Sequence, residues 1–134
     1  MARISGTEVR KAAQEAGYRS GFEHRVAQQL EAAGVKYEYE PKDGILEYRV
    51  NELRKYLPDF RLPGGVLVEC KGRLTAADRK KLKLVKEAWP QLTICLLFQY
   101  NNKLNPRSKT RYSDWAEKNG FPWALREVPE TWLF

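Results

Sequence analysis

The feature that most limits the possible folds of this chain is a β-hairpin predicted over residues 57–71. In the segment LPDFRLPGGVLVECKG, two stretches that lean towards apolar residues flank a Pro-Gly-Gly run at 63–65, and such a run is a strong turn signal. Because strand side chains alternate between two faces, Glu69 and Lys71 project from the same side of the second strand. These charges indicate either a functional site or the solvent-facing side of a half-buried sheet.

The residues before the hairpin predict one helix and two strands. Apolar residues recur at helical spacing over residues 20–33, and Gly34 follows as a helix-ending residue, which together predict a helix. Residues 35–40 alternate strictly between two sets of side chains, so they are predicted to form a strand. Alternating apolar residues at 46–50 suggest a further strand within the less regular segment 41–56.

The residues after the hairpin predict two more helices and one strand. Thr75 can cap a helix that ends before Pro90. Residues 91–98 (QLTICLLF) form a nearly continuous apolar run, typical of a strand buried on both faces. A short helix is predicted near 113–119, and the aromatic tail is expected to pack back on the body. The predicted fold is one α/β domain of mixed α+β type over residues 1–134, with a mixed central sheet flanked by helices in the order α-β-β-β-α-β-α.

The charge of the chain suits a polyanionic partner. Lysine and arginine number 24 against 17 acidic residues, which gives a formal net charge of +7 and a pI near 9.5. No apolar run approaches the ~20 residues of a membrane span. The N-terminal segment also lacks the apolar core of a secretory signal. We therefore expect no membrane partner and a cytoplasmic location.

The cysteine and histidine content argues against a disulfide and against zinc. Cys70 and Cys95 both lie within apolar strand-like runs, which favours free buried thiols in a reducing cytoplasm. With one histidine, His24, and no CxxC pair, the chain has almost no material for a zinc site.

Asp59, Glu69 and Lys71 are residue types that phosphodiester hydrolysis can use. The reaction needs a nucleophilic water, neutralisation of charge on the phosphoryl oxygens and help for the leaving oxygen, which Mg²⁺ held by carboxylates can supply. A nearby lysine can position or deprotonate the water, or stabilise the developing negative charge. Cross-strand neighbours in a hairpin lie ~5 Å apart, so Asp59 and Glu69 are expected to be close enough to share a metal ion.

The surrounding sequence narrows this interpretation. Pro58-Asp59 followed by Glu69-x-Lys71 resembles the PD-(D/E)xK signature of restriction-endonuclease-like nucleases. Together, YRSGFEHRVAQQLEAAGVKYEYE and PDFRLPGGVLVECKG strongly resemble the phage endonuclease I family of four-way (Holliday) junction resolvases. The likeness covers residues 18–72, and continues more loosely through DRKKLKLVKEAWPQLTI to PETW near the end.

The resemblance implies a restriction-endonuclease-like core and a metal-dependent site that cuts branched DNA. It implies two Mg²⁺ ions per site, for which Mn²⁺ would substitute, and no small-molecule cofactor. The metal ligands would be Glu23, Asp59, Glu69 and the backbone carbonyl of Cys70, while Lys71 would serve the water or the transition-state charge and Glu38 would lie near the site.

Each of these residues also has a purely structural interpretation. Residues 20–23 match a capping box, although Glu23 also borders the apolar stripe of its helix and so leans towards the protein body. Glu38 is a common residue type on the solvent face of a strand, Asp59 can be a turn-flanking acid, and Lys71 can be a surface lysine. The coincidence of the hairpin acids and lysine with the family pattern favours the catalytic interpretation.

The resemblance further implies a homodimer that cuts two strands of a branched double-stranded junction, with one active site per strand. It implies an exchange of segments, in which the helix bearing Glu23 joins the hairpin residues of the other subunit and residues 41–56 form the connecting bridge. The two-fold symmetry of such a dimer would match that of the junction. A phage origin would place the protein in the cytoplasm of an infected bacterium.

DNA affinity draws mostly on phosphate contacts from lysine and arginine. The loop 101–111 has four such residues and no acid, which suits phosphate contact, whereas the basic face of the helix after Thr75 is slightly better explained as solvated surface. Residues 1–18 are expected to include a mobile arm that orders on DNA. The residues predicted to contact DNA are Lys11, Arg19, Arg73, Arg79, Lys80, Lys103, Arg107, Lys109 and Arg111.

Two other functions stay open at this point. The first is a nicking, mismatch or homing endonuclease on the same scaffold, and the second is a basic DNA- or RNA-binding module without catalysis. The sequence has no helix-turn-helix, zinc finger or basic zipper that would read a base sequence, so selectivity for DNA shape is the more natural expectation. Replacing Asp59 or Glu69 would leave a non-catalytic module unchanged, whereas a resolvase so altered would bind junctions without cutting them.

Overall fold

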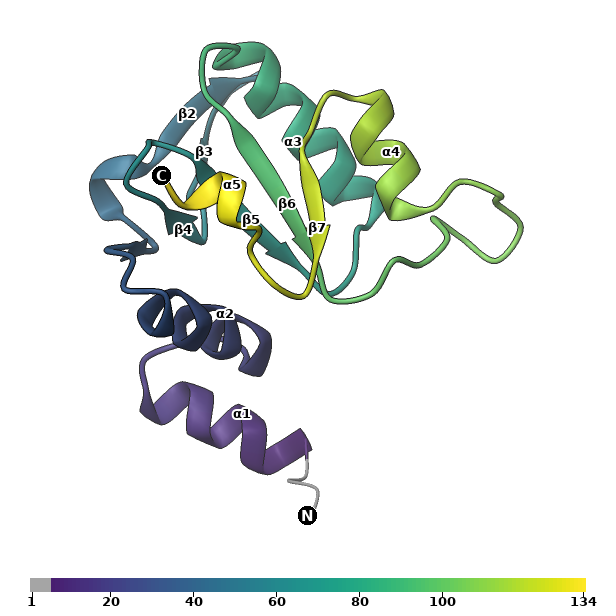
Figure 1. The fold of residues 1–134 in the computed structure, drawn as a ribbon. Coiled ribbons are helices and arrows are strands. Elements are labelled where there is room, and N and C mark those ends of the chain that lie inside the picture. Colours follow the sequence, from purple (N-terminus) through teal and green to yellow (C-terminus); the bar gives the residue numbers. More distant parts are fainter. Residues whose placement is uncertain (1–5) are drawn as a thin grey trace.

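A mixed five-stranded β-sheet lies at the centre of the protein, seen in a computed structural model that describes residues 6–134 (Figure 1). Its strands are β1 (Glu38–Tyr39), β4 (Phe60–Arg61), β5 (Leu67–Lys71), β6 (Ile94–Phe98) and β7 (Trp123–Leu125). They are arranged in the order β1-β4-β5-β6-β7. Strands β5, β6 and β7 run parallel, whereas β4 is antiparallel to both β5 and β1.

Strand β6 is buried on both faces, as its continuous apolar sequence predicts. Its side chains alternate, so Leu96 and Phe98 enter a core on one face of the sheet while Cys95 and Leu97 enter a second core on the other. The sheet thus separates two hydrophobic cores that share β6.

The first face of the sheet is covered by two helices and a small separate sheet. Thr75 begins the longer helix, because its hydroxyl accepts a hydrogen bond from the backbone N–H of Asp78. At the other end of that helix, Trp89 donates its indole N–H to the backbone carbonyl of Glu47 at 2.8 Å, which attaches the small sheet. These elements are α3 (Ala76–Ala88), α4 (Tyr112–Lys118), β2 (Leu46–Arg49) and β3 (Leu53–Tyr56).

The second face is covered by α2 (Gly21–Ala32) and α5 (Glu130–Leu133). Gln29 of α2 ties the two segments together. Its side-chain amide donates to the carbonyl of Val128 at 2.9 Å and accepts from the N–H of the same residue at 2.8 Å. This pair of bonds fixes the C-terminal half of α2 against the C-terminal segment.

Helix α1 (Gly6–Glu15) packs on α2 and stands away from the sheet (Figure 1). The contact depends on Gly21, the first residue of α2. A Cβ at this position would overlap Cγ1 of Val9. Glycine therefore allows the two helices to approach at the point where α2 begins.

Most of the predicted elements are confirmed. The helix at 20–33, the helix after Thr75, the buried strand and the short helix near 113–119 all form close to their predicted bounds. The Pro-Gly-Gly turn closes the β4–β5 hairpin, with Leu62 donating its N–H to the carbonyl of Val66 and Gly65 at φ +83°. Both cysteines are free thiols, and the C-terminal tail packs on the second core.

Several elements differ from the sequence prediction. Only Glu38 and Tyr39 of the predicted strand 35–40 pair, because their neighbour β4 is equally short and Glu40 turns to φ +44°. Segment 41–56 forms a 3-10 turn at Lys42–Gly44 and the β2–β3 hairpin, which lies outside the central sheet. Strand β7, helices α1 and α5 and two further strands before α3 add to the predicted order, which becomes α-α-β-β-β-β-β-α-β-α-β-α in the described residues.

Parts of the predicted organisation stay predictions. Helix α1 occupies part of the segment expected to form an N-terminal arm, while residues 1–5 of that arm lie outside the described residues. The exchange of segments between subunits and the bridging role of residues 41–56 are likewise not tested by a single chain. Within residues 6–134, no helix combines the length and apolar character needed to cross a membrane.

Candidate active site

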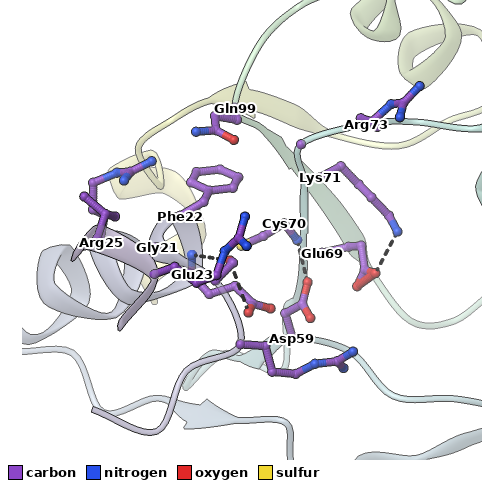
Figure 2. A pocket seen from close by; sticks show the side chains of 15 residues that line it. Gly21, Phe22, Glu23, Arg25, Asp59, Glu69, Cys70, Lys71, Arg73 and Gln99 are labelled. Atoms are coloured by element: carbon purple, nitrogen blue, oxygen red, sulfur yellow. Dashed lines mark hydrogen bonds and ion pairs between the residues drawn. The ribbon is translucent and has the colours of Figure 1, made fainter. Parts of the chain in front are cut away.

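An open pocket of about 660 Å³ lies between the start of α2 and the ends of β5 and β6 (Figure 2). It brings together four of the predicted site residues, Glu23, Asp59, Glu69 and Lys71. Figure 2 shows Asp59 between Glu23 and Glu69, with Lys71 beyond Glu69. The predicted convergence of three acids and one lysine is therefore present within one chain.

Asp59 is held by the hairpin itself. It directly precedes β4, and its Oδ2 accepts a hydrogen bond of 2.8 Å from the backbone N–H of Cys70 on β5. The β4–β5 register pairs Phe60 with Val68, which brings the residues on either side of that pair next to each other. The antiparallel pairing thus places Asp59 beside Glu69, as the hairpin prediction required.

Glu69 lies on β5 and is only 8% exposed. The hydroxyl of Tyr56, at the end of β3, donates to its Oε2 at 3.0 Å. On the other side, the Nζ of Lys71 lies 3.5 Å from its Oε1. Tyr56 is itself buried in the first core, so the small sheet supplies a rigid donor that fixes one oxygen of this carboxylate. No sequence pattern indicated this contact, because Tyr56 and Glu69 meet only through tertiary packing.

Glu23 takes part in the cap of α2 and also directs its carboxylate into the pocket. Ser20 accepts a hydrogen bond of 3.1 Å from the backbone N–H of Glu23, which caps α2. The carboxylate of Glu23, however, turns into the pocket, where its Oε1 accepts from the hydroxyls of Tyr39 at 3.1 Å and Ser20 at 3.3 Å. One residue therefore helps to start the helix and presents a buried carboxylate to the site.

Glu40 is an acidic residue that the sequence interpretation missed. One oxygen each from Glu23, Glu40 and Asp59 lie within 4.8 Å of one another. The left-handed backbone of Glu40 directs its side chain towards this group, and Arg19 forms an ion pair with it at 3.4 Å. The one available signal was Pro41, which has no backbone N–H and so cannot continue the strand pairing beyond Glu40.

Glu38, by contrast, is not brought to the pocket. Its carboxylate accepts from Nε of Arg61, which also binds Asp43 at 3.0 Å. The hydrogen bond from Arg61 lowers the pKa of Glu38 below its ordinary value. Because Glu38 and Tyr39 are adjacent strand residues, they point to opposite faces, and Tyr39 is the one that reaches Glu23. Glu38 therefore lies outside the residues that line the pocket in this chain, and its expected role near the site stays a prediction.

The acidic groups strongly raise the pKa of Asp59. Burial, the charge of Glu69 and the charge of Glu23 together raise it to about 10. Burial also raises the pKa of Glu69, although Lys71 and Tyr56 oppose that shift. Carboxylates gathered in this way need a compensating positive charge. Their oxygens are the ligands that Mg²⁺ prefers, so the residues present fit a divalent cation.

Lys71 keeps its positive charge in this environment. Burial acts to lower the pKa of its ammonium group, but the carboxylates of Glu69 and Asp78 outweigh burial and raise it. A charged ammonium group can stabilise negative charge on a phosphate more readily than it can accept a proton from water. Lys71 therefore presents a cationic group at the pocket, 3.5 Å from the carboxylate of Glu69.

The predicted DNA-contacting residues fall into three groups. Arg19 and Arg73 line the pocket directly. Arg79 and Arg111 each donate to a backbone carbonyl, of Leu74 at 2.9 Å and of Asn101 at 3.0 Å respectively, so both are partly committed to the fold. The remaining predicted contacts are all exposed at the surface and are Lys11, Lys80, Lys103, Arg107 and Lys109. Cys70, whose carbonyl is a predicted metal ligand, also lines the pocket, while burial raises the pKa of its thiol.

Asp59→Asn should stabilise the metal-free protein by an amount that grows with pH. The pKa of Asp59 is about 10 in the folded chain against an ordinary 3.8. The protonated carboxyl therefore favours folding fully below pH 4, and this contribution is lost as the pH rises towards 10. Asparagine does not ionise. Calorimetry in EDTA from pH 5 to pH 9 should show the Tm difference between Asp59→Asn and wild type widening, and a constant difference would contradict the raised pKa of Asp59 in the folded protein.

The fold and the pocket define an α+β protein with an acidic site suited to a divalent cation at the edge of a mixed sheet. The sequence profile of the family described as phage endonuclease I matches residues 1–134. The chain belongs to the phage endonuclease I family.

Two curated relatives support this assignment. Endodeoxyribonuclease 1 of Enterobacteria phage T3 is 38% identical over 128 residues, covering 94% of this chain and 83% of the relative. Endonuclease I of Escherichia phage T7 is 38% identical over 122 residues, covering 87% of this chain and 78% of the relative. The similarity therefore extends well beyond the hairpin motif to nearly the whole chain.

Proposed function

We propose that this protein is a Mg²⁺-dependent endodeoxyribonuclease that resolves four-way and other branched DNA junctions. The observation that carries the proposal is the convergence of Glu23, Asp59 and Glu69 beside Lys71 in one open pocket. The names of the relatives, endodeoxyribonuclease 1 and endonuclease I, support the same reaction class. The net charge of +7 supports a polyanionic substrate.

Glu23, Asp59 and Glu69 would hold the metal, with the carbonyl of Cys70 as a further ligand and two ions per site. When bound, Mg²⁺ would activate the water and neutralise charge on the phosphoryl oxygens, and Mn²⁺ would substitute for it. The protein prepares this site by burying the carboxylates and fixing each through a neighbour. Tyr39 holds Glu23, the N–H of Cys70 holds Asp59, and Tyr56 holds Glu69.

The cationic side chains would act on the DNA. Lys71 would stabilise the negative charge that develops on the phosphate, because it stays protonated between two carboxylates. Arg19 and Arg73 line the pocket and would bind the phosphates on either side of the cleaved bond. The loop 101–111 would add contacts further along a DNA arm through Lys103, Arg107 and Lys109.

A homodimer would cut the two strands of a junction symmetrically. In the form with exchanged segments, Glu23 would come from one subunit and the hairpin residues from the other. The β2–β3 hairpin lies in the segment 41–56 proposed as the bridge. Such an exchange would replace the contacts that α2 makes within one chain by the same contacts between chains.

The decisive experiment offers the purified protein three labelled DNAs in Mg²⁺: a four-way junction, a linear duplex and a duplex with a mismatch. We expect the junction to be cut at least about 100-fold faster than the linear duplex, since shape rather than sequence would position the sites. EDTA should abolish cleavage of all three. Efficient cutting of the linear duplex at one sequence would identify a site-directed nuclease, preference for the mismatch a mismatch nuclease, and binding without cutting a non-catalytic module.

A further inference from the structure

Asp78 connects the start of α3 to the pocket lysine through its two carboxylate oxygens. Oδ2 accepts a hydrogen bond from the backbone N–H of Thr75 at 3.0 Å, while Oδ1 lies 3.2 Å from Nζ of Lys71. Thr75 in turn caps the helix by accepting from the N–H of Asp78 at 3.1 Å. A reciprocal capping box therefore fixes the Asp78 carboxylate on a rigid element.

Lys71 lies between two acids that pull it in different directions. Its Nζ is 3.5 Å from Oε1 of Glu69 and 3.2 Å from Oδ1 of Asp78. A lysine side chain has several rotatable bonds and little intrinsic preference for one position. Glu69 alone would draw the ammonium group onto the carboxylate that the proposed metal site needs. Asp78 supplies the opposing attraction from outside the pocket, because it is not among the residues that line it.

We propose that Asp78 is a positioning residue that holds the ammonium group of Lys71 away from Glu69 and towards the reacting phosphate. The inference rests on the proposed nuclease function. Asp78 acts through Lys71 and does not itself touch DNA or metal. The helix cap requires only Oδ2 of Asp78, so the direction of Oδ1 towards Lys71 is a second task that the capping role does not explain.

The test compares Asp78→Asn with a matched cap variant, Thr75→Ala. Asparagine keeps the shape and one oxygen for the N–H of Thr75, but it removes the negative charge facing Lys71. Alanine at position 75 removes the hydroxyl that caps α3 and leaves the contact between Asp78 and Lys71. For each variant we would measure the single-turnover cleavage rate of a four-way junction in Mg²⁺, the junction Kd in Ca²⁺, and the Tm.

We expect Asp78→Asn to lower the cleavage rate about 10- to 100-fold, the usual effect of losing a residue that orients a catalytic group, with Kd changed less than about threefold. Thr75→Ala should lower the Tm by about 3–6 °C and leave the rate within about threefold of wild type. Asp78→Glu restores a carboxylate within reach of Lys71, so it should recover most of the rate that Asp78→Asn loses.

Three results would overturn the inference. They are wild-type cleavage by Asp78→Asn, a loss of rate in proportion to Tm for both variants, and cleavage by Asp78→Glu that is as slow as that by Asp78→Asn. In each case Asp78 only caps α3. The cleavage rate of wild-type protein in the same assay shows whether the positioning role of Asp78 or the proposed nuclease function has failed. If wild type leaves every DNA intact in Mg²⁺, the nuclease proposal itself is wrong.

Discussion

Asp59→Asn protein should bind four-way junctions with wild-type affinity and cut them about 10³-fold more slowly, a loss of about 4 kcal/mol of transition-state stabilisation. The asparagine side chain would keep the hydrogen bond that the N–H of Cys70 donates to position 59 but could no longer ionise to bind the metal as a carboxylate. Single-turnover cleavage in Mg²⁺ and gel-shift binding in Ca²⁺ separate the two effects. Because asparagine removes the cost of keeping a buried carboxyl protonated above its ordinary pKa, the metal-free variant should be at least as stable as wild type at neutral pH.

A matched control for this substitution is Glu47→Gln. Glu47 is an exposed acid on β2 that also loses one negative charge on substitution. The cleavage rate of Glu47→Gln should stay within about twofold of wild type, since Glu47 does not line the pocket and salt screens the charges of exposed residues. Equal rates for Asp59→Asn and Glu47→Gln would show that the central carboxylate is dispensable, and the catalytic proposal would then fail.

Phe60→Ala should cost the folded protein about 3–5 kcal/mol, the usual penalty for truncating a buried phenylalanine. Phe60 is fully buried, packs against the rings of Tyr37 and Tyr39 at centroid distances of 5.5 and 5.3 Å, and follows Asp59 directly. Such a loss is a large fraction of the total stability of a domain. Urea unfolding at fixed protein concentration should show a much lower midpoint.

The same truncation at an exposed position provides the control. Phe134 is 84% exposed, and Phe134→Ala should change the free energy of unfolding by less than about 0.5 kcal/mol. Phe60→Ala should also lose cleavage activity at temperatures where it still folds, because β4 orients Asp59. If Phe60→Ala lowered the free energy of unfolding by less than about 1 kcal/mol, the stability of the second core would not depend on this buried side chain, and the prediction would be wrong.

The elements that were predicted well are those with strong local signals. The apolar run of β6, the Pro-Gly-Gly turn, and the caps Ser20 and Thr75 each fix their structure within a short stretch of chain. Strand β7 could not be predicted in the same way, because Trp123–Leu125 has an ordinary sequence and becomes a strand only by pairing with β6. Pairing between distant segments leaves no local trace.

The same contrast applies to the site. Its hairpin acids could be predicted from the sequence, whereas the residues that donate hydrogen bonds to its carboxylates could not. Asp59, Glu69 and Lys71 stand in a motif that is visible along the chain. Tyr39 and Tyr56, which hold two of the carboxylates, come from strands whose position depends on tertiary contacts. Glu40, rather than Glu38, has its carboxylate near Glu23 and Asp59. The backbone of Glu40 is left-handed, and the alternation of strand residues does not predict this change in chain direction.

The two hydrogen bonds between Gln29 and Val128 limit which residues these two positions can accept during evolution. Both bonds reach the main chain of residue 128, so its side chain must only be apolar and must not be proline. At position 29, glutamine supplies a donor and an acceptor together, which glutamate or lysine cannot do. Relatives should therefore vary freely at 128 among aliphatic residues while holding an amide at 29.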